Sequence, residues 1–271
     1  MSRRLAIASQ KGGCGKTTTA LNLSLALAER GQRTLLVDLD PQGGVGHALA
    51  RPDQALHGLA DVLMGACGIG QAVMQTKLPG LSLLPRGRLD PIDVCEYEMA
   101  LLDADVLSEH LALAEAGYDL VIVDTPSGLG IPTRAALRIA DFVLLPVQAE
   151  PLALRTITQA LRLVEHVRLH ENPRLHLLGL LPTMVARESE ASMGVLIAAW
   201  RDLTGVLETT IPRAEVFARA SEAGLPVSYL AGKPPPEGRR FDLLAGELEI
   251  LISQVDKEGP TDVERQARQL L

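Results

Sequence analysis

One stretch near the N-terminus, IASQKGGCGKTTTALNLSLALAERG (residues 7–31), constrains the fold more than any other part of the chain. It begins as an apolar strand, passes through a glycine-rich turn and continues as a helix with periodic apolar residues. Glycines let backbone amides approach an anion closely, and the positive N-terminal end of the helix points to the same place. The stretch therefore predicts a phosphate-binding loop between a strand and a helix.

Short apolar runs and helical patterns alternate along the rest of the chain. Most of the apolar runs lack polar alternation, as in a parallel sheet that is covered on both faces. The pattern predicts an α/β fold, with a doubly wound, mostly parallel sheet and helices on both faces. Strands are expected at 4–9, 33–40, 81–85, 118–126, 141–148, 174–183 and 206–212, and helices near 17–29, 99–116, 132–140, 151–169, 188–203, 213–223 and 241–255. Residues 50–80 are less clear.

Composition limits the size and surroundings of the protein. The 271 residues are 47% hydrophobic, enough for one α/β core, so we expect a single domain over 1–256 and a tail over 257–271 that is disordered or a short helix. No apolar run is long enough for a transmembrane helix, and three cysteines without CxxC spacing fit a reducing cytoplasm. With a formal charge of −7, any binding to nucleic acid requires a local basic patch.

Charged and hydroxyl side chains stand at the helical end of the glycine-rich turn. Lys16 would reach the β- and γ-phosphates of a nucleotide, Thr17 would ligate Mg²⁺, and Thr18 is well placed for the α-phosphate. The strict pattern G-x-x-x-x-G-K-[ST] is not met, because Gln10 occupies the first glycine position. A second lysine, Lys11, stands in the turn instead, although one lysine is enough to neutralise a phosphate.

The string Lys11-Gly12-Gly13-Cys14-Gly15-Lys16-Thr17 resembles the deviant Walker A motif, K-G-G-x-G-K-T, of the ParA/MinD family of ATPases. The resemblance implies that Lys11 acts across a dimer interface on the partner's nucleotide, as an arginine finger does in other NTPases. We interpret Cys14 as a small apolar filler in preference to a redox switch. The residues that would bind ATP are Gly12, Gly13, Cys14, Gly15, Lys16, Thr17 and Thr18.

Aspartates end two of the expected strands. LVIVDTPSG places Asp124 in the Walker B form, where it would hold Mg²⁺ through the water shell of the ion. LLVDLDPQGG supplies Asp38 and Asp40, which lie two apart and so share a face of the strand. The run D-x-D-P-Q-G again resembles the family, and this implies that Asp40 positions or polarises the attacking water while Asp38 supports the metal site. The residues alone leave open which of the two is catalytic.

The resemblance covers most of the chain and extends to the nucleotide base. LLPTMVARES and TTIPRAEV match the segments that supply the base pocket in the family, which places Pro212 at the adenine with Thr183 and Met184 close by. The segment 124–137 would be the switch that senses the γ-phosphate. DLDPQG and PVQAEPLALRTITQAL favour the ParA branch, known for DNA partition, over the MinD branch.

The ParA branch implies a function. Its members form an ATP-sandwich homodimer, bind DNA without sequence preference, and hydrolyse ATP when an adaptor stimulates them, thereby moving DNA or another large cargo over the nucleoid. Here the DNA contacts would come from basic residues in the C-terminal part of the domain, but acids are interspersed among them, so composition does not establish a patch. The candidates are Arg187, Arg213, Arg219, Lys233, Arg239 and Arg240.

Two other functions compete with this one. A MinD-like spatial regulator recruited to membranes needs a C-terminal amphipathic helix, but DVERQARQLL offers only Val263, Leu270 and Leu271 as large apolar groups, so a membrane partner is not expected. A metabolic P-loop enzyme, similar to dethiobiotin synthetase or the nitrogenase iron protein, is the third. The latter needs paired cysteines for an iron–sulfur cluster, and Cys67 and Cys95 do not lie in the corresponding segment.

Overall fold

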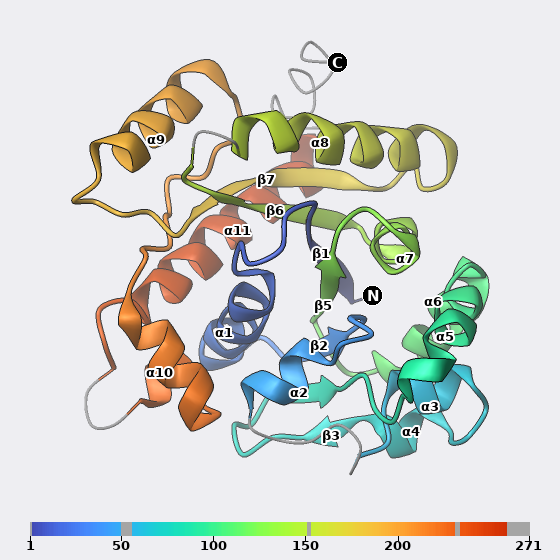
Figure 1. Ribbon diagram of the computed structural model, residues 1–271. Coiled ribbons are helices and arrows are strands. Elements are labelled where there is room, and N and C mark those ends of the chain that lie inside the picture. The colour runs from blue at the N-terminus through green and yellow to red at the C-terminus, as the bar shows by residue number, and fades with distance from the viewer. Residues whose placement is uncertain (1, 50–55, 151–152, 231–233, 259–271) are drawn as a thin grey trace.

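A seven-stranded sheet in the order β3-β4-β2-β5-β1-β6-β7 organises the molecule (Figure 1). The structure is a computed structural model that describes residues 2–49, 56–150, 153–230 and 234–258. All neighbouring strands run parallel except β3, which pairs antiparallel with β4 at one edge. The strands are β1 (Arg3–Ser9), β2 (Thr34–Asp38), β3 (Met74–Gln75), β4 (Leu81–Leu84), β5 (Leu120–Ser127), β6 (Phe142–Gln148) and β7 (His176–Thr183).

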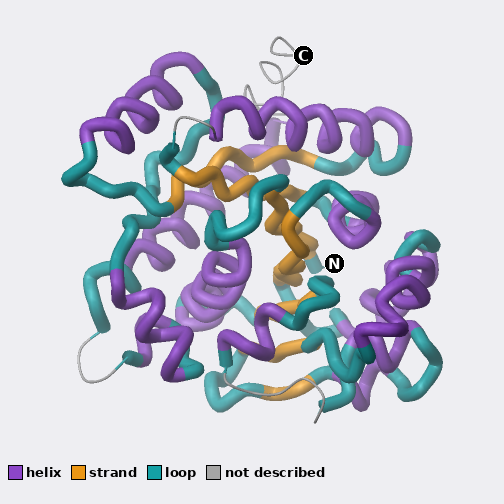
Figure 2. The backbone as a smooth tube through the Cα atoms, viewed as in Figure 1, coloured by secondary structure: helices purple, strands orange, loops and turns teal. Residues whose placement is uncertain are grey.

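Helices cover both faces of this sheet (Figure 2). The helices are α1 (Lys16–Glu29), α2 (Gly44–Ala48), α3 (Leu59–Leu63), α4 (Ile69–Ala72), α5 (Val94–Ala100), α6 (Ala104–Ala114), α7 (Ile131–Ile139), α8 (Ala153–His170), α9 (Glu190–Asp202), α10 (Glu215–Ala223) and α11 (Arg239–Glu258), with 3₁₀ turns η2 (Pro91–Asp93) and η3 (Val227–Tyr229). No described helix is long and apolar enough to cross a membrane.

Alternate residues of the buried strands build two cores. On one face, Ala6, Val37 and Val123 pack with helices α3 and α5–α8. On the other face, Ile7 and Ile122 pack with α1 and α11. Because side chains alternate across a strand, strands that are apolar at every position can serve both cores at once. The predicted doubly wound, mostly parallel α/β fold is confirmed.

The structure corrects the sequence-based assignment in two places. The expected strand at 206–212 forms only isolated bridges, Val206 with Leu180 and Pro212 with Val185, because this segment meets the edge of the sheet at two separate points. The expected helix at 99–116 is divided between α5 and α6. Asp103 divides it, since its carboxylate accepts hydrogen bonds from the amides of Asp105 and Val106 and so caps a new helix.

The chain at Gly58 and the loop at 85–88 cross at contact distance beside α5 and α6. A side-chain carbon on Gly58 would lie 2.3 Å from both the amide nitrogen of Gly87 and the carbonyl oxygen of Pro85, so only glycine fits there. Asp61 ties the crossing together by accepting hydrogen bonds from the amides of Gly58 and Arg88 and from the Arg88 guanidinium. The loop at 85–88 is therefore fixed relative to the N-terminus of α3.

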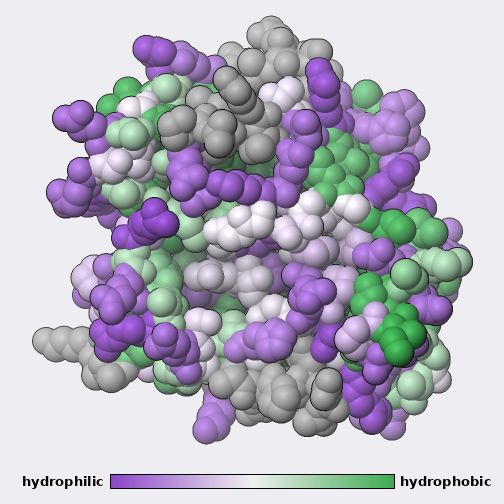
Figure 3. Space-filling model, in the orientation of Figure 1, coloured by the Kyte–Doolittle hydropathy of each residue, from purple (hydrophilic) through white to green (hydrophobic). Residues whose placement is uncertain are grey.

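Helix α5 lies next to this crossing and has two contrasting faces. Tyr97 is its one fully buried residue, whereas Met99 on the same helix is 67% exposed. Ile92 in the preceding turn is also exposed, and Figure 3 shows hydrophobic surface over this part of the molecule. The inner face of α5 therefore presents a single large side chain, Tyr97, to the interior.

Candidate nucleotide site

The loop between β1 and α1 has the form of an anion cradle. Gly15, the residue before the helix, has φ 86°, a left-handed conformation that glycine adopts without strain. No side chain caps α1 and its first turn carries no acid, so its amides are available to an anion. Behind the loop, the Thr183 hydroxyl donates a 2.8 Å hydrogen bond to the carbonyl of Cys14, which is 1% exposed. Cys14 is therefore buried beneath the loop.

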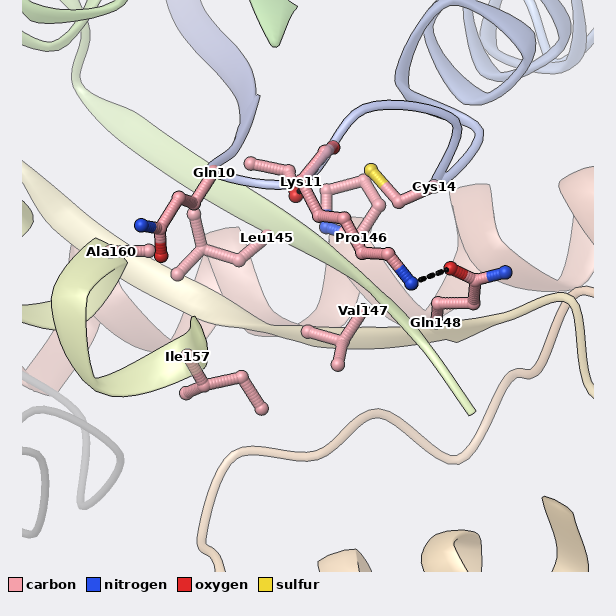
Figure 4. Close-up of a pocket in the computed structure, with 10 residues that line it drawn as sticks. Gln10, Lys11, Cys14, Leu145, Pro146, Val147, Gln148, Ile157 and Ala160 are labelled. Atoms are coloured by element: carbon pink, nitrogen blue, oxygen red, sulfur yellow. Dashed lines mark hydrogen bonds between the residues drawn. The ribbon is translucent and has the colours of Figure 1, made fainter. Parts of the chain in front are cut away.

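The two lysines of the loop lie in different places. Lys16 is 7% exposed, and its charge acts on the buried Asp124. Lys11 is partly exposed, and its ammonium group donates a 2.8 Å hydrogen bond to Oε1 of Gln148, the last residue of β6 (Figure 4). It also donates to Glu150 Oε2 at 2.9 Å, just beyond this strand. Gln148 also donates to Glu150, at 2.9 Å, and completes this small network. Lys11 is therefore directed to a different set of partners from Lys16.

Asp38 and Asp124 sit opposite each other on the adjacent strands β2 and β5, and both are fully buried. Burial, reinforced by the charge of Asp124, raises the pKa of Asp38 well above its ordinary value. Asp38 accepts hydrogen bonds from the amides of Asp40 at 3.0 Å and Val45 at 2.9 Å, one on each oxygen. Asp38 therefore shapes the turn that carries Asp40, a role in addition to the metal support predicted for it.

Of the two buried aspartates, Asp124 has the carboxylate that is better placed to bind a cation. Neither of its oxygens has a hydrogen bond of regular geometry among the described residues. Burial raises the pKa of Asp124 to about 7, although the neighbouring Thr17 hydroxyl and Lys16 ammonium lower it in part. The described residues include no cluster of three or more acids, histidines or cysteines that could hold a metal ion unaided. Thr17 and Asp124 instead fit a Mg²⁺ ion, which usually binds through one or two protein groups, waters and substrate phosphates.

Replacing Asp124 with asparagine is expected to stabilise the nucleotide-free protein at about pH 8. Between the ordinary pKa of 3.8 and about 7, the unfolded state releases a proton that the folded state keeps, so stability falls as pH rises through this window. Each pKa unit corresponds to about 1.4 kcal/mol, and we expect a gain of roughly 2 kcal/mol after relaxation of the site. Thermal unfolding of both proteins in EDTA at several pH values measures this gain in stability.

The wild type and Asp124→Asn should converge below about pH 3, where the carboxyl group is protonated in both the folded and the unfolded state. A melting temperature for Asp124→Asn below that of the wild type at about pH 8 would show that the carboxylate stabilises the empty site, contrary to this account.

A cavity beside the loop collects the residues predicted for the base. Its lining includes Gly15, Thr18, Thr183, Met184 and Pro212. Met184 has φ 51°, an uncommon conformation for a residue other than glycine, and its sulfur accepts a hydrogen bond from Gln148 at 3.3 Å. The segments after β7 and before α10 therefore meet at the phosphate loop, as the sequence predicts.

The candidate DNA-binding residues are placed differently. Arg187 lies between β7 and α9, Arg213 lies just before α10 and Arg219 on it, and Arg239 and Arg240 begin α11. Within the described part of the chain these arginines form no ion pair; four of them are exposed, and Arg240 is half-buried. The remaining candidate, Lys233, lies outside the described residues.

Sequence reasoning missed several residues around Asp40 and Lys11. The Tyr97 hydroxyl donates to the carbonyl of Leu39 at 3.2 Å, and Arg86 Nη1 donates to the carbonyl of Pro41 at 2.8 Å. Both donors lie in parts of the chain that no motif marked. Gln148 and Glu150, by contrast, stand in the PVQAE string that had already been noticed, but the string did not indicate their contact with Lys11.

A strand that enters a glycine-rich turn, an uncapped helix and a buried aspartate on the adjacent strand define a P-loop nucleoside-triphosphatase. A family model described as AAA domain matches residues 2–177. The chromosome partitioning protein ParA of Caulobacter vibrioides is 39% identical over 240 residues, which are 83% of this chain and 86% of the relative. The chain belongs to the ParA/MinD family of P-loop ATPases.

Solved structures agree with this assignment. The structure of cobyrinic acid a,c-diamide synthase from Mycobacterium smegmatis with bound ADP and magnesium is 33% identical, has a TM-score of 0.76, and covers 96% of this chain and 99% of its own. The cell division ATPase MinD of Pyrococcus furiosus is 27% identical, has a TM-score of 0.74, and covers 93% of this chain and 100% of its own.

Proposed function

We propose that this protein is a Mg²⁺-dependent ATPase that closes into a homodimer around two ATP molecules. The observation that carries the proposal is the separation of the two lysines. Lys16 is buried beside Asp124, where it can neutralise the phosphates of its own nucleotide. Lys11 instead extends to Gln148 and Glu150 and is partly exposed, and in the dimer it would exchange these partners for the nucleotide of the second subunit. A cation supplied in this way accelerates hydrolysis by about 10³ to 10⁵ in other NTPases.

Each group of the site then has a part in hydrolysis. The first-turn amides of α1 and Lys16 hold the phosphates, and Asp40 polarises the attacking water. Thr17 and Asp124 would hold Mg²⁺, which neutralises charge that develops on the transferred phosphoryl group. ATP as the nucleotide and Mg²⁺ as the metal are supported by the related M. smegmatis structure, which contains ADP and magnesium.

The cellular role proposed is partition: the ATP dimer binds DNA without sequence preference and positions DNA or another cargo over the nucleoid until an adaptor stimulates hydrolysis. The kinship with ParA supports this role. The exposed arginines on α10 and at the start of α11 support DNA binding, because a dimer doubles the number of basic residues that face one duplex.

The proposal is tested by the oligomeric state with a non-hydrolysable ATP analogue. Wild-type protein is expected to elute as a dimer in light-scattering chromatography, whereas Lys11→Ala stays monomeric while still binding the analogue. Lys77→Ala, which removes an exposed lysine away from the loop, is the matched control and should dimerise normally. Wild-type protein that is saturated with analogue yet monomeric at high concentration would refute the proposal.

A gel shift with a non-specific duplex then distinguishes the branches of the family. We expect ATP-dependent binding that weakens steeply with salt, and that weakens further in the charge-removing double variant Arg213→Ala/Arg219→Ala. Sedimentation with lipid vesicles is the counter-test. ATP-dependent sedimentation with vesicles, together with no DNA shift, would favour the membrane-recruited MinD-like role instead.

A further inference from the structure

We propose that Tyr97 and Arg86 are positioning residues that fix the direction of Asp40 during ATP hydrolysis. The inference rests on the proposed function, in which Asp40 polarises the attacking water. Neither residue touches the phosphate loop in the described contacts. Each acts through a backbone carbonyl, one on either side of Asp40.

The peptide group that precedes Asp40 is held at both of its polar atoms. Its carbonyl, from Leu39, accepts the 3.2 Å hydrogen bond from the Tyr97 hydroxyl. Its N–H, from Asp40, donates to Asp38 Oδ1 at 3.0 Å. The neighbouring Leu39 N–H donates to the carbonyl of Asp124 at 3.0 Å and so ties the turn to β5. With these atoms fixed, the backbone cannot rotate freely where it enters Asp40.

The chain that leaves Asp40 is held as well. The carbonyl of Asp40 accepts a 2.8 Å hydrogen bond from the amide of Gly43. The carbonyl of Pro41 accepts the bond from Arg86, whose loop is fixed by the crossing of Gly58 and Gly87. The carbonyls on either side of Asp40 are therefore held by side chains from two other segments, Tyr97 on α5 and Arg86 in the loop after β4.

The Asp40 side chain itself has little to hold it. Among the described residues, its carboxylate accepts one hydrogen bond, from the amide of Gln42 at 2.8 Å, and the residue is half-buried. The direction of the carboxylate thus depends on the backbone beneath it. Tyr97 is 0% exposed. If the hydrogen bond between its hydroxyl and the Leu39 carbonyl were broken, both buried groups would be left without a partner, which costs free energy.

The test separates positioning from folding. Tyr97→Phe keeps the buried ring and removes only the hydroxyl, so kcat for ATP is expected to fall about tenfold while KM and the affinity for the ATP analogue stay within about twofold. Arg86→Met should act in the same direction, and Arg86→Lys, which keeps a donor, should recover part of the rate. Tyr229→Phe removes an exposed phenol that donates to Glu29 and should leave kcat unchanged.

The outcomes separate this inference from the proposed function. If the wild type has no ATPase activity, the proposed function itself fails. If Asp40→Ala retains wild-type turnover, the catalytic role belongs to another residue and the inference about Tyr97 and Arg86 falls with it. If Asp40→Ala is inactive but Tyr97→Phe and Arg86→Met keep wild-type kcat, the inference is overturned. It is also overturned if these variants lower the melting temperature and the nucleotide affinity in parallel while kcat is unchanged. Should Tyr97→Phe not fold, the comparison of Arg86→Met with Arg86→Lys decides, because a lysine that restores no rate contradicts a donor role.

Discussion

Lys16→Ala is expected to weaken ATP binding by at least about 100-fold. Lys16 is 7% exposed at the start of α1, and its charge lowers the pKa of the buried Asp124 beside it. Charge-assisted hydrogen bonds to phosphate contribute about 1.5 to 3 kcal/mol each, and alanine removes every such bond that Lys16 makes. Titration calorimetry or a fluorescent nucleotide measures the loss.

The matched control for Lys16→Ala is again Lys77→Ala, which removes one positive charge from an exposed position. It should bind ATP as the wild type does, and both variants should keep the melting temperature of the empty protein to within a few degrees. Micromolar affinity retained by Lys16→Ala would refute the assignment of the phosphate loop.

Asp40→Ala is expected to lower ATP turnover by at least about 100-fold while nucleotide affinity changes little. General-base or water-positioning groups contribute about 10² to 10⁴ to the rate, and Asp40 makes no described contact that would hold the phosphates. The slow step is then hydrolysis, so the ATP-bound dimer should accumulate. Phosphate release and light-scattering chromatography with ATP measure the two effects.

Two further variants show whether the effect of Asp40→Ala comes from the lost charge or from a change in the turn. Asp40→Asn can still accept the hydrogen bond from the Gln42 amide, so it tests the charge while the turn is preserved. Asp38→Asn removes a buried carboxylate that accepts two backbone amides, and we expect it to perturb the turn as a whole. Turnover that is unchanged in Asp40→Ala would move the catalytic role to another residue.

The sequence predicted the parts of this molecule that depend on local pattern. The buried strands β1, β2 and β4–β7 are recognisable as apolar runs, because both faces of the sheet are covered, whereas the two-residue edge strand β3 was not predicted. The phosphate loop is equally local, since glycines, Lys16 and Thr17 must stand in fixed order between a strand and a helix. Because acids that hold Mg²⁺ must stand beside the phosphates, the loop also indicated which strand ends would carry them. Asp38 and Asp124 lie opposite each other on β2 and β5.

What the sequence left unpredicted depends on contacts between distant segments. Tyr97 and Leu39 are 58 residues apart, and Lys11 is 137 residues from Gln148, so no periodicity links them. The segment from 50 to 80 was hard to assign, since its helices α3 and α4 have only five and four residues, too few for an amphipathic repeat. The expected strand at 206–212 was wrong because this segment forms bridges only at Val206 and Pro212. Between them, the amides of Glu208 and Thr209 donate to the carboxylate of Glu247 and not to a neighbouring strand.

The crossing of Gly58 and Gly87 makes this enzyme sensitive to substitutions at two positions outside the nucleotide pocket. Any larger residue at position 58 or 87 must push the two loops apart, and Arg86 travels with one of them. A genetic screen for inactive alleles should therefore recover lesions at Gly58 and Gly87 that look, in an assay, like damage to the reaction centre. Such alleles would still bind ATP, and their defect would be a misdirected Asp40 carboxylate.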